Sequence, residues 1–177
     1  MKRTADQLSA MMARFEAVIR GAGIRMTPQR LEIYRQTAAT VTHPDIETIH
    51  REVRKTMPGV SLDTVYRTLD LFREMGLLSS LRPFPGPVRF DANTSPHHHF
   101  VCTRCGAALD FEDRDFDNLR IPAAASVLGH VLTLHVELRG LCAPCAAGAA
   151  GASKPGTPRS IGTKSHRQYN AASARRD

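Results

Sequence analysis

Apolar residues recur at helical spacing through the first half of the chain. From Ala5 to about Ile19 they form one stripe that stops at Gly21, which predicts a first helix. A second helix is expected to begin at Thr27-Pro28, because threonine is a good N-terminal cap and proline fits the first helical position. The stripes of these helices comprise Leu8, Met11, Met12, Phe15, Val18 and Ile19 in the first and Leu31, Ile33 and Tyr34 in the second.

Two further helices follow, separated by a tight turn. The third is expected between residues 43–44, His-Pro, and residues 58–59, Pro-Gly. The fourth begins with Ser61 as its cap, carries apolar residues on one face and stops at Gly76. Two helices joined in this way predict a helix-turn-helix, whose second helix enters the major groove of DNA.

The stretch after the fourth helix predicts a wing. Residues 77–81 and 88–90 have the pattern of two short strands around a turn-rich segment, residues 82–87. Together with the helices, these strands predict a winged-helix DNA-binding domain over residues 1–85, followed by a hinge over residues 86–91.

The pattern changes after the hinge. Residues 100–102 and 107–111 are predicted strands on either side of a Cys-x-x-Cys pair, and residues 131–141 alternate well enough for another strand. Residues 115–128 predict a helix that Pro122 interrupts or shortens. The fold class is therefore α+β, with an N-terminal winged helix-turn-helix domain followed by a small α/β domain.

Composition separates the tail from the second domain, which we expect over residues 92–147. Residues 148–177 are rich in Ala, Gly, Ser and Pro with scattered basic residues, so they cannot bury enough apolar surface to offset the entropy lost on ordering. A disordered basic tail is predicted there, which either attracts phosphates nonspecifically or is a solvated extension.

Charge is unevenly distributed along the chain, whose net charge is +7. Residues 1–82 hold 13 Lys and Arg against 9 Asp and Glu, residues 83–145 hold 5 against 7, and residues 146–177 hold 6 against 1. The basic first half favours contact with a polyanion such as DNA. No stretch near the start is apolar and long enough for a signal peptide or a membrane span, so we expect a cytoplasmic protein without a membrane partner.

The four cysteines form the most specific pattern in the sequence. Cys102 pairs with Cys105 and Cys142 with Cys145, each as Cys-x-x-Cys, with 36 residues between the pairs. Soft thiolates in two such pairs suit one closed tetrahedral zinc site per subunit, which leaves no position for an activated water. Two disulfides are the alternative, but they need an oxidising compartment that nothing in the sequence indicates.

Three consecutive histidines precede the first cysteine pair. In a strand, His97 and His99 point to one face and can chelate one ion, while His98 points to the other face. Spacing alone leaves a solvated polar loop as an equal alternative. A metal site is favoured because imidazoles with carboxylates suit Fe²⁺, Mn²⁺ or Zn²⁺, and the further candidate ligands are His43, Asp91 and Asp110.

Several motifs at consistent spacing give the chain a resemblance to the ferric uptake regulator family over about residues 10–145. They are Gly-Ile-Arg-Met-Thr-Pro-Gln-Arg at 23–30, His-Pro at 43–44, Ser-Leu-Asp-Thr-Val-Tyr-Arg-Thr-Leu at 61–69, Arg-Phe-Asp at 89–91, the three histidines and both cysteine pairs. The resemblance implies a homodimeric repressor that binds a palindromic double-stranded DNA operator, with the second domain as its dimerisation domain. It also implies one structural zinc and, between the two domains, one regulatory metal per subunit.

The resemblance also implies the ligands of the regulatory metal. Carried over position by position, they are His43, Asp91, His97, His99 and Asp110, which would hold Fe²⁺ or Mn²⁺. Iron-sensing members usually have glutamate where Asp91 and Asp110 stand, whereas peroxide-sensing members have aspartate at both positions, so this chain resembles the peroxide sensors. In those, peroxide oxidises a histidine beside the iron, which would be His43 or His97 here.

Two departures bear on a further metal site that many relatives have. Pro96 and Leu134 stand where histidines would be expected, and His135, one residue later, should face the opposite side. We therefore expect a single regulatory site, with His98 and His135 as polar surface residues.

The residues expected to contact DNA lie on and near the fourth helix. Tyr66 can touch thymine methyl groups and Arg67 can reach base edges or phosphates, with Thr64 near the start of the helix. Arg25 and Arg30 are expected closer to the phosphates. The alternative for each arginine is a solvated surface charge, and for Tyr66 it is partial burial in the core.

These expectations combine into a metal-dependent repressor that releases its operator when peroxide oxidises a histidine of the regulatory site. Peroxide then acts as a signal, and no other small molecule is expected. An iron- or zinc-responsive uptake regulator of the same family is the nearest alternative. A small metallohydrolase that activates water at His97, His99 and an aspartate is another, although no motif for a substrate cleft or a general base is present.

Overall fold

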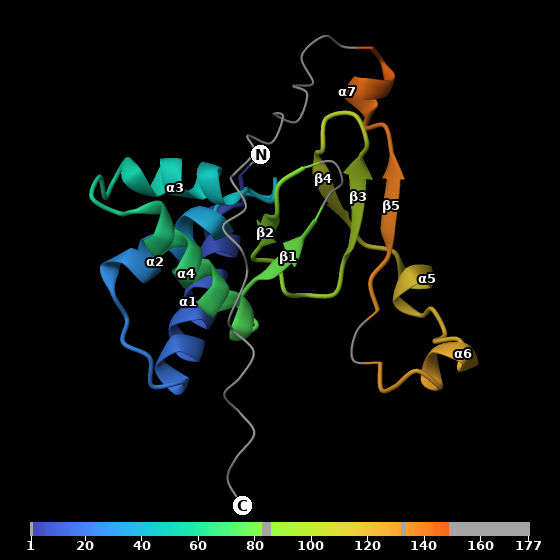
Figure 1. Cartoon of the computed structure of the whole chain (residues 1–177), viewed down its shortest axis with the longest axis horizontal. Helices are drawn as coiled ribbons and strands as arrows, with labels where there is room; N and C mark the ends of the chain where they lie inside the picture. Colours follow the sequence, from blue (N-terminus) through green and yellow to red (C-terminus); the bar gives the residue numbers. More distant parts are fainter. Residues whose placement is uncertain (1, 83–85, 132–133, 149–177) are drawn as a thin grey trace, which may run out of the picture.

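The computed structural model of the chain describes residues 2–82, 86–131 and 134–148. In these ranges, no helix has the length and apolar character to cross a membrane. The helices of residues 5–74 gather on one side of the molecule (Figure 1). Each helix of this half begins at a capping side chain that accepts a backbone N–H of the first turn. The helices and their caps are α1 (Ala5–Gly21, Thr4), α2 (Pro28–Ala38, Thr27), α3 (Ile46–Arg54, Asp45) and α4 (Leu62–Glu74, Ser61).

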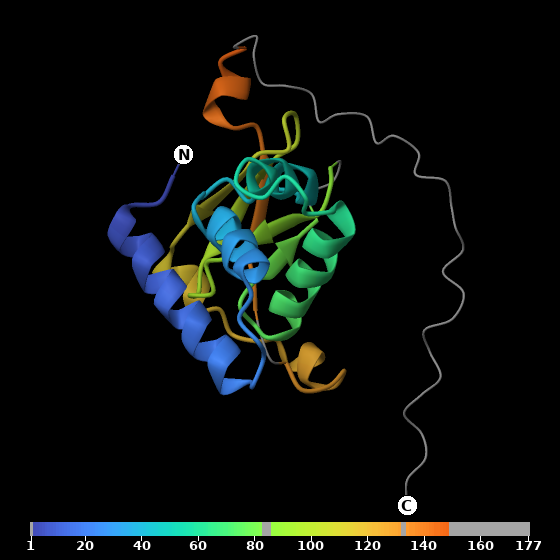
Figure 2. The ribbon, with the colours of Figure 1, turned by 90° about the vertical axis from the view of Figure 1, so that its left-hand side faces the viewer.

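These helices pack around an apolar core that is centred on three aromatic rings. Phe15 stacks on Tyr34 with ring centroids 4.2 Å apart, and Phe72 meets both rings edge-on at 5.1 and 5.8 Å. Figure 2, drawn from the helical side, shows α1 to α4 in front of the strands. Because α4 buries Val65, Leu69 and Phe72 against this core, its opposite face is left to solvent.

Two small sheets follow the helices. In the first, β1 and β2 pair antiparallel and form the base of the wing. In the second, β3 lies between β4, its antiparallel neighbour, and β5, its parallel neighbour. The remaining elements are β1 (Ser79–Leu81), β2 (Arg89–Asp91), β3 (His98–Cys102), β4 (Ala108–Phe111), α5 (Arg114–Asp117), α6 (Ala123–Ser126), β5 (Glu137–Gly140) and α7 (Ala143–Ala146).

The helix expected over residues 115–128 is interrupted at Pro122, as predicted. It forms the separate short helices α5 and α6, because Pro122 takes an extended backbone as the N-cap of α6 and has no N–H to continue a helix. One expectation is wrong: among the described residues of the strand expected over 131–141, only Glu137–Gly140 is strand, which is β5. The tail from residue 149 and the wing tip at 83–85 lie outside the described residues, and the proposed limits of the domains and the hinge stay predictions.

The two halves meet where β2 runs beside the loop between α2 and α3. The backbone N–H of Phe90 donates to the carbonyl oxygen of Pro44 at 3.0 Å. Arg89 Nη1 donates to the carbonyl oxygen of His43 at 3.1 Å. These bonds bring the end of β2, Asp91, next to a loop of the helical half.

Candidate metal centres

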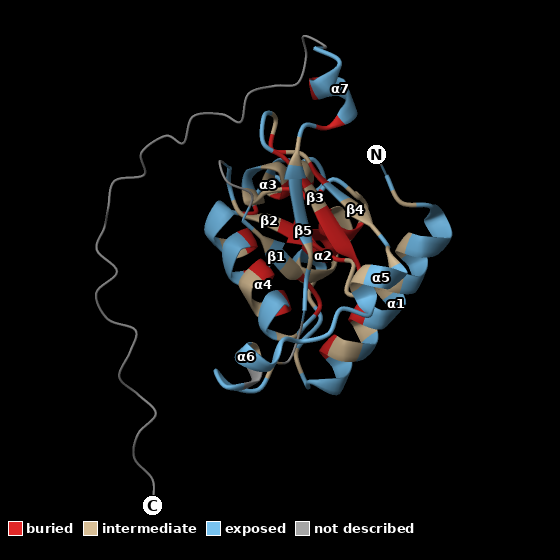
Figure 3. Cartoon of the chain, turned by 90° about the vertical axis from the view of Figure 1, so that its right-hand side faces the viewer, coloured by how far each residue is buried: buried red, intermediate tan, exposed pale blue. Residues whose placement is uncertain are grey.

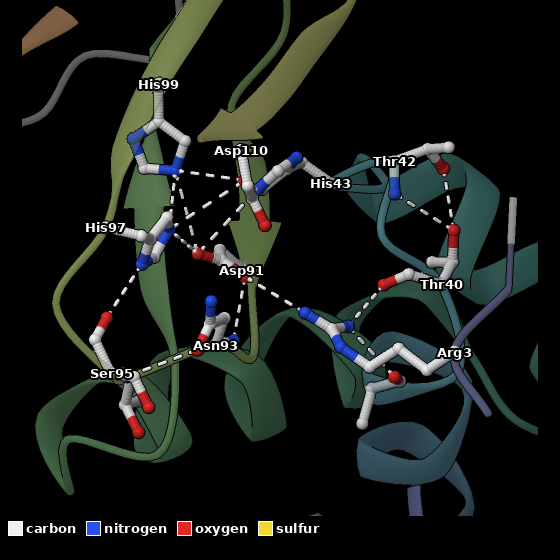
Figure 4. Close-up of polar contacts among 12 residues, drawn as sticks. Arg3, Thr40, Thr42, His43, Asp91, Asn93, Ser95, His97, His99 and Asp110 are labelled. Atoms are coloured by element: carbon white, nitrogen blue, oxygen red, sulfur yellow. Dashed lines mark hydrogen bonds and ion pairs between the residues drawn. The ribbon is translucent and has the colours of Figure 1, made fainter. Parts of the chain in front are cut away.

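Five side chains from both halves converge on one point (Figure 4). His43 comes from the loop before α3, Asp91 ends β2, His97 directly precedes β3, His99 lies in β3, and Asp110 lies in β4. One possible ligand atom of each residue lies within 4.8 Å of those of all the others. The structure thus brings together the complete set of residues expected around the regulatory metal.

Strand register explains how the sheet contributes three of these side chains. His99 and Asp110 are direct partners across β3 and β4, so their side chains share one face of the sheet. His97, two residues before His99, shares that face, and the Nε2 atoms of the two imidazoles are 2.9 Å apart. His97 Nδ1 lies 2.7 Å from the carbonyl oxygen of Ser95, to which it can only donate. This bond leaves His97 Nε2 as the acceptor that faces the cluster.

His43 has a strained backbone. Its φ of +48° lies in the left-handed region, and within the described ranges no other non-glycine residue has a positive φ. Strain of this kind costs about 1–3 kcal/mol and is concentrated at functional sites. The buried imidazole of His43 places Nε2 2.8 Å from Asp110 Oδ1 and 3.6 Å from Asp91 Oδ2.

Several atoms that face the centre of the cluster are buried without a hydrogen bond. His43 Nε2 and Asp110 Oδ1 are close, but their angles do not suit a hydrogen bond. Among the described residues, these two atoms and Asp91 Oδ2 have no hydrogen-bond partner. A buried polar atom without a partner costs about 1–3 kcal/mol. A cation at the centre would satisfy all three atoms, so the cluster fits a metal ion.

The charges of the cluster are strongly coupled. Burial by itself would lower the pKa of His43, but the carboxylates of Asp110 and Asp91 outweigh it and raise that pKa to about 9. The pKa of His97 is also raised, chiefly by its contact with Asp91. Burial would raise the pKa of Asp91, but the adjacent imidazoles hold it well below its ordinary value. A divalent ion must displace the imidazole protons, so metal binding at this site is coupled to proton release.

The four cysteines form a second cluster at the other end of β3. Cys102 ends β3, Cys105 lies in the following turn, and Cys142 and Cys145 lie at the cap and inside α7, with all sulfur atoms within 4.8 Å of one another. Cys105 Sγ and Cys142 Sγ are 3.7 Å apart. A tetrahedral ion with Zn–S bonds of about 2.3 Å needs an S–S edge of about 3.8 Å. All four thiols are free, so the structure does not support the disulfide alternative.

The thiols differ in how readily they ionise. Burial would raise the pKa of Cys102, but backbone N–H groups, including those of Cys105 and Cys142, outweigh it and lower that pKa to about 6. Burial and the neighbouring thiols raise the pKa of Cys145 to about 12. Four thiolates in this small space need a soft divalent cation to offset their repulsion, which fits Zn²⁺.

His98 is not a surface residue, contrary to the expectation. Its side chain is buried between the rings of Phe111 and Phe116, with both centroids 5.5 Å away, and its Nε2 lies 3.2 Å from Asp117 Oδ1. The reason is that α5 covers the face of β3 opposite to the metal cluster. His135 is exposed, and His98 and His135 both border a cavity of about 490 Å³.

The side chains expected to contact DNA lie on the helical half. Tyr66 is 58% exposed and does not pack into the core, so the burial alternative for this residue is wrong. Arg67 is exposed and pairs with Asp63 one turn earlier on α4 at 2.9 Å. The remaining candidates are Thr64, in the first turn of α4, and the pair Arg25 and Arg30, in which the Arg30 guanidinium donates to the Arg25 carbonyl oxygen.

Two residues beside the histidine and aspartate cluster were not predicted. Arg3 Nη2 lies 3.8 Å from Asp91 Oδ1, and the backbone N–H of Asn93 donates to the same oxygen at 2.8 Å. Asn93 follows Asp91 by two residues, so an Asx turn could have been expected there. Arg3 has no signal in the sequence, because its contact depends on where the N-terminus lies.

Comparison with known proteins identifies the family. The sequence model of the ferric uptake regulator family matches residues 21–138, well over half of the chain. The chain belongs to the ferric uptake regulator family. A family relative, the peroxide-responsive repressor PerR of Staphylococcus aureus (strain Mu50), is 33% identical over 129 residues, which cover 73% of this chain and 87% of PerR.

Solved structures of the family share the fold. The ferric uptake regulator of Helicobacter pylori matches with a TM-score of 0.64 and 22% identity, over 82% of this chain and 97% of that protein. A zinc uptake regulator solved with zinc and DNA matches with a TM-score of 0.60 and 24% identity, over 82% and 98% of the two chains. These likenesses confirm the α+β architecture with its helical N-terminal domain and small C-terminal sheet domain.

Membership of the ferric uptake regulator family settles the functional class. The chain is a metal-dependent transcriptional regulator similar to PerR, and family members of this kind bind operator DNA. It is a regulator and not an enzyme, which excludes the metallohydrolase alternative. Its two clusters are consistent with a structural zinc and a regulatory metal.

Proposed function

We propose that this protein is a repressor that senses peroxide through Fe²⁺ held by His43, Asp91, His97, His99 and Asp110. The observation that carries the proposal is the largely buried cluster of three imidazoles and two aspartates, in which several atoms that face the centre make no hydrogen bond. Mixed nitrogen and oxygen donors suit Fe²⁺ or Mn²⁺, which these five residues would hold. When bound, iron supplies the redox chemistry that activates peroxide.

His43 and His97 are the residues we expect to be oxidised. Both point Nε2 into the cluster and would hold the iron through it, so the adjacent ring carbon of each would be exposed to oxidation by peroxide when iron is bound. Oxygen added to that carbon removes a good ligand, and the affinity for the metal falls. The 33% identity to a peroxide-responsive repressor and the aspartates at positions 91 and 110 support this reading.

Loss of the metal would change the relative orientation of the two halves. His43 belongs to the helical half, whereas the other four ligands come from the hinge and the sheet domain. Metal occupancy therefore selects one orientation. In a homodimer, only that orientation would let both α4 helices meet successive half-sites of a palindromic operator. The exposed Tyr66, Arg67 and Thr64 would then contact DNA, with Arg25 and Arg30 near the phosphates.

The outer surface of the sheet domain supports the homodimer. Figure 3 shows β5 in front with largely exposed residues. Apolar side chains that a soluble domain would bury gather on and around this sheet, and they include Leu109, Leu134, Leu138 and Leu141. A second copy of the chain would cover this apolar sheet face, because a two-fold dimer pairs the same surface patch of both subunits. In each subunit, Zn²⁺ at the four cysteines would hold the two ends of this domain together, and the free thiols agree with a cytoplasmic location.

Operator binding in the presence of peroxide tests the proposal. The zinc-loaded protein should bind its operator with either Fe²⁺ or Mn²⁺. Peroxide should release only the Fe²⁺ form and add one oxygen atom to a peptide that contains His43 or His97. If peroxide leaves binding unchanged and no such mass shift occurs, the chain is instead an iron- or zinc-responsive uptake regulator, identified by the metal that activates DNA binding.

A further inference from the structure

The N-terminal arm, residues 2–4, lies against the end of α2 and the loop that carries His43. The backbone N–H of Arg3 donates to the carbonyl oxygen of Ala39 at 3.1 Å, and Lys2 pairs with Thr40 as an isolated antiparallel bridge. These contacts tie the start of the chain to the helical half only a few residues before His43.

The side chain of Arg3 continues from this arm into the regulatory cluster (Figure 4). Nη1 donates to the carbonyl oxygens of Ala38 and Thr40 at 3.0 and 2.5 Å, and Nη2 lies 3.8 Å from Asp91 Oδ1. The side chains of Arg3 and Asp91 are only 8% and 2% exposed. Because arginine stays charged when it is buried, it needs an anionic partner, and Asp91 is the carboxylate that it faces.

The two oxygen atoms of Asp91 have different surroundings. Oδ2 faces the imidazoles and lies 2.9 Å from His97 Nε2. Oδ1 accepts the N–H of Asn93 at 2.8 Å and faces Arg3. Arg3 and Asn93 thus hold one oxygen and leave the other free to bind a metal.

We propose that Arg3 is a positioning residue for the regulatory metal, and that metal binding and docking of the N-terminal arm stabilise each other. This inference rests on the metal site of the proposed function. By facing Oδ1, Arg3 orients Asp91 so that Oδ2 points toward the imidazoles, where it would hold the metal. Because coupling between two sites is reciprocal, an ion that orders Asp91 also tightens the arm.

A second arginine, Arg14 of α1, supports the same coupling. The Arg14 guanidinium donates to the hydroxyl of Thr94, three residues after Asp91. Two arginines from the N-terminal segment therefore reach the short stretch 91–94 that leads into the sheet domain. The arm and α1 would follow any movement of this stretch when the metal leaves.

Mn²⁺ titration of the zinc-loaded full-length protein tests the role of Arg3. Partners that orient metal ligands contribute about 10–100-fold to affinity, so Arg3→Ala should weaken Mn²⁺ binding by that factor. Arg3→Lys should give an intermediate affinity, because one ammonium keeps the charge but cannot donate to both carbonyls and face Asp91 at the same time, as the guanidinium does. Arg20→Ala, which removes an exposed arginine from α1, is the matched control and should bind like the wild type, and all variants should retain zinc.

Hydrogen exchange gives a second readout. Mn²⁺ should slow exchange of the backbone amide of residue 3 in the wild type, and this slowing should be absent in Arg3→Ala. The inference would be overturned if Arg3→Ala bound Mn²⁺ as tightly as the wild type, or if Mn²⁺ did not change hydrogen exchange in the N-terminal arm of the wild type. Either result would leave the peroxide-sensing proposal intact. A wild type that binds no Mn²⁺ would overturn both.

Discussion

His43 Nε2 lies 2.8 Å from Asp110 Oδ1, and this contact joins the helical half to the sheet domain. His43 belongs to the loop before α3 and Asp110 to β4, so no hydrogen bond of regular secondary structure connects them. An ion held by both would fix the relative orientation of the two halves, which is the property that a metal-dependent DNA-binding protein needs.

Substitution of His43→Ala should uncouple the halves. It removes the ligand that the helical half supplies. Loss of a residue that only orients a metal ligand lowers metal affinity by roughly 10–100-fold, and loss of the ligand itself should lower Mn²⁺ affinity by at least as much. Operator binding should be lost at Mn²⁺ concentrations that saturate the wild type, while zinc content stays unchanged. Calorimetric titration and a gel-shift assay measure the two effects. His135→Ala, at an exposed histidine, is the control, and equal behaviour of the two variants would contradict the assignment.

Substitution of Cys142→Ser should release the structural metal. Zinc sites of this type contribute on the order of 10 kcal/mol to the folding of small domains, so the sheet domain should unfold at a lower temperature. A chromophoric chelator should detect one zinc per chain in the wild type and none in the variant. Thr103→Ser, in the turn between Cys102 and Cys105, should keep its zinc. Full zinc content in Cys142→Ser would rule out the four-cysteine site.

Arg67→Ala should weaken operator binding without affecting either metal. An arginine that contacts a base is worth about 1–3 kcal/mol, and its loss should be smaller if it contacts only phosphate. Arg73→Ala, in the last turn of the same helix and paired with Asp70, is the matched control. Fluorescence anisotropy with labelled operator distinguishes the variants. An equal effect of both substitutions would indicate a general loss of positive charge rather than a contact made by Arg67.

Glu32 should make stability depend on pH. Its carboxylate accepts bonds of 2.7–2.8 Å from Arg35, Gln36 and Thr56, which tie α2 to the end of α3. Burial opposes the charge, but these bonds outweigh it and lower the pKa of Glu32 below 4.5. The stabilisation is therefore complete above the unfolded-state pKa and is lost as the pH falls through the folded-state pKa.

Urea unfolding of Glu32→Gln at several pH values checks this dependence. The variant should be less stable than the wild type by about 1–3 kcal/mol at pH 7, because Arg35, Gln36 and Thr56 lose a charged acceptor. The difference should begin to shrink as the pH falls below the unfolded-state pKa of about 4.3, and it should be lost once the pH has fallen through the lowered folded-state pKa. A difference that stays constant with pH would show that the charge of Glu32 does not contribute.

Local chemistry explains why much of this protein could be predicted from its sequence. Thr27 and Ser61 cap helices with their own side chains, which depends only on the next three residues. The spacing of His97 and His99 places both on one side of an extended chain, and each Cys-x-x-Cys pair can approach one ion without help from the rest of the fold. Short-range pattern therefore pointed to His97 with His99 and to each cysteine pair, whereas the family resemblance implied the full ligand set that adds His43, Asp91 and Asp110.

Tertiary structure decided what depends on contacts between distant segments. His98 is buried only because α5 packs over the opposite face of β3, and Arg3 meets Asp91 only because the arm follows the loop after α2. No pattern of spacing encodes either contact, since the partners are far apart in the chain. The sequence by itself determined which residues can bind metal, and the tertiary structure decided which other residues orient them, because orientation is set by packing across the two halves.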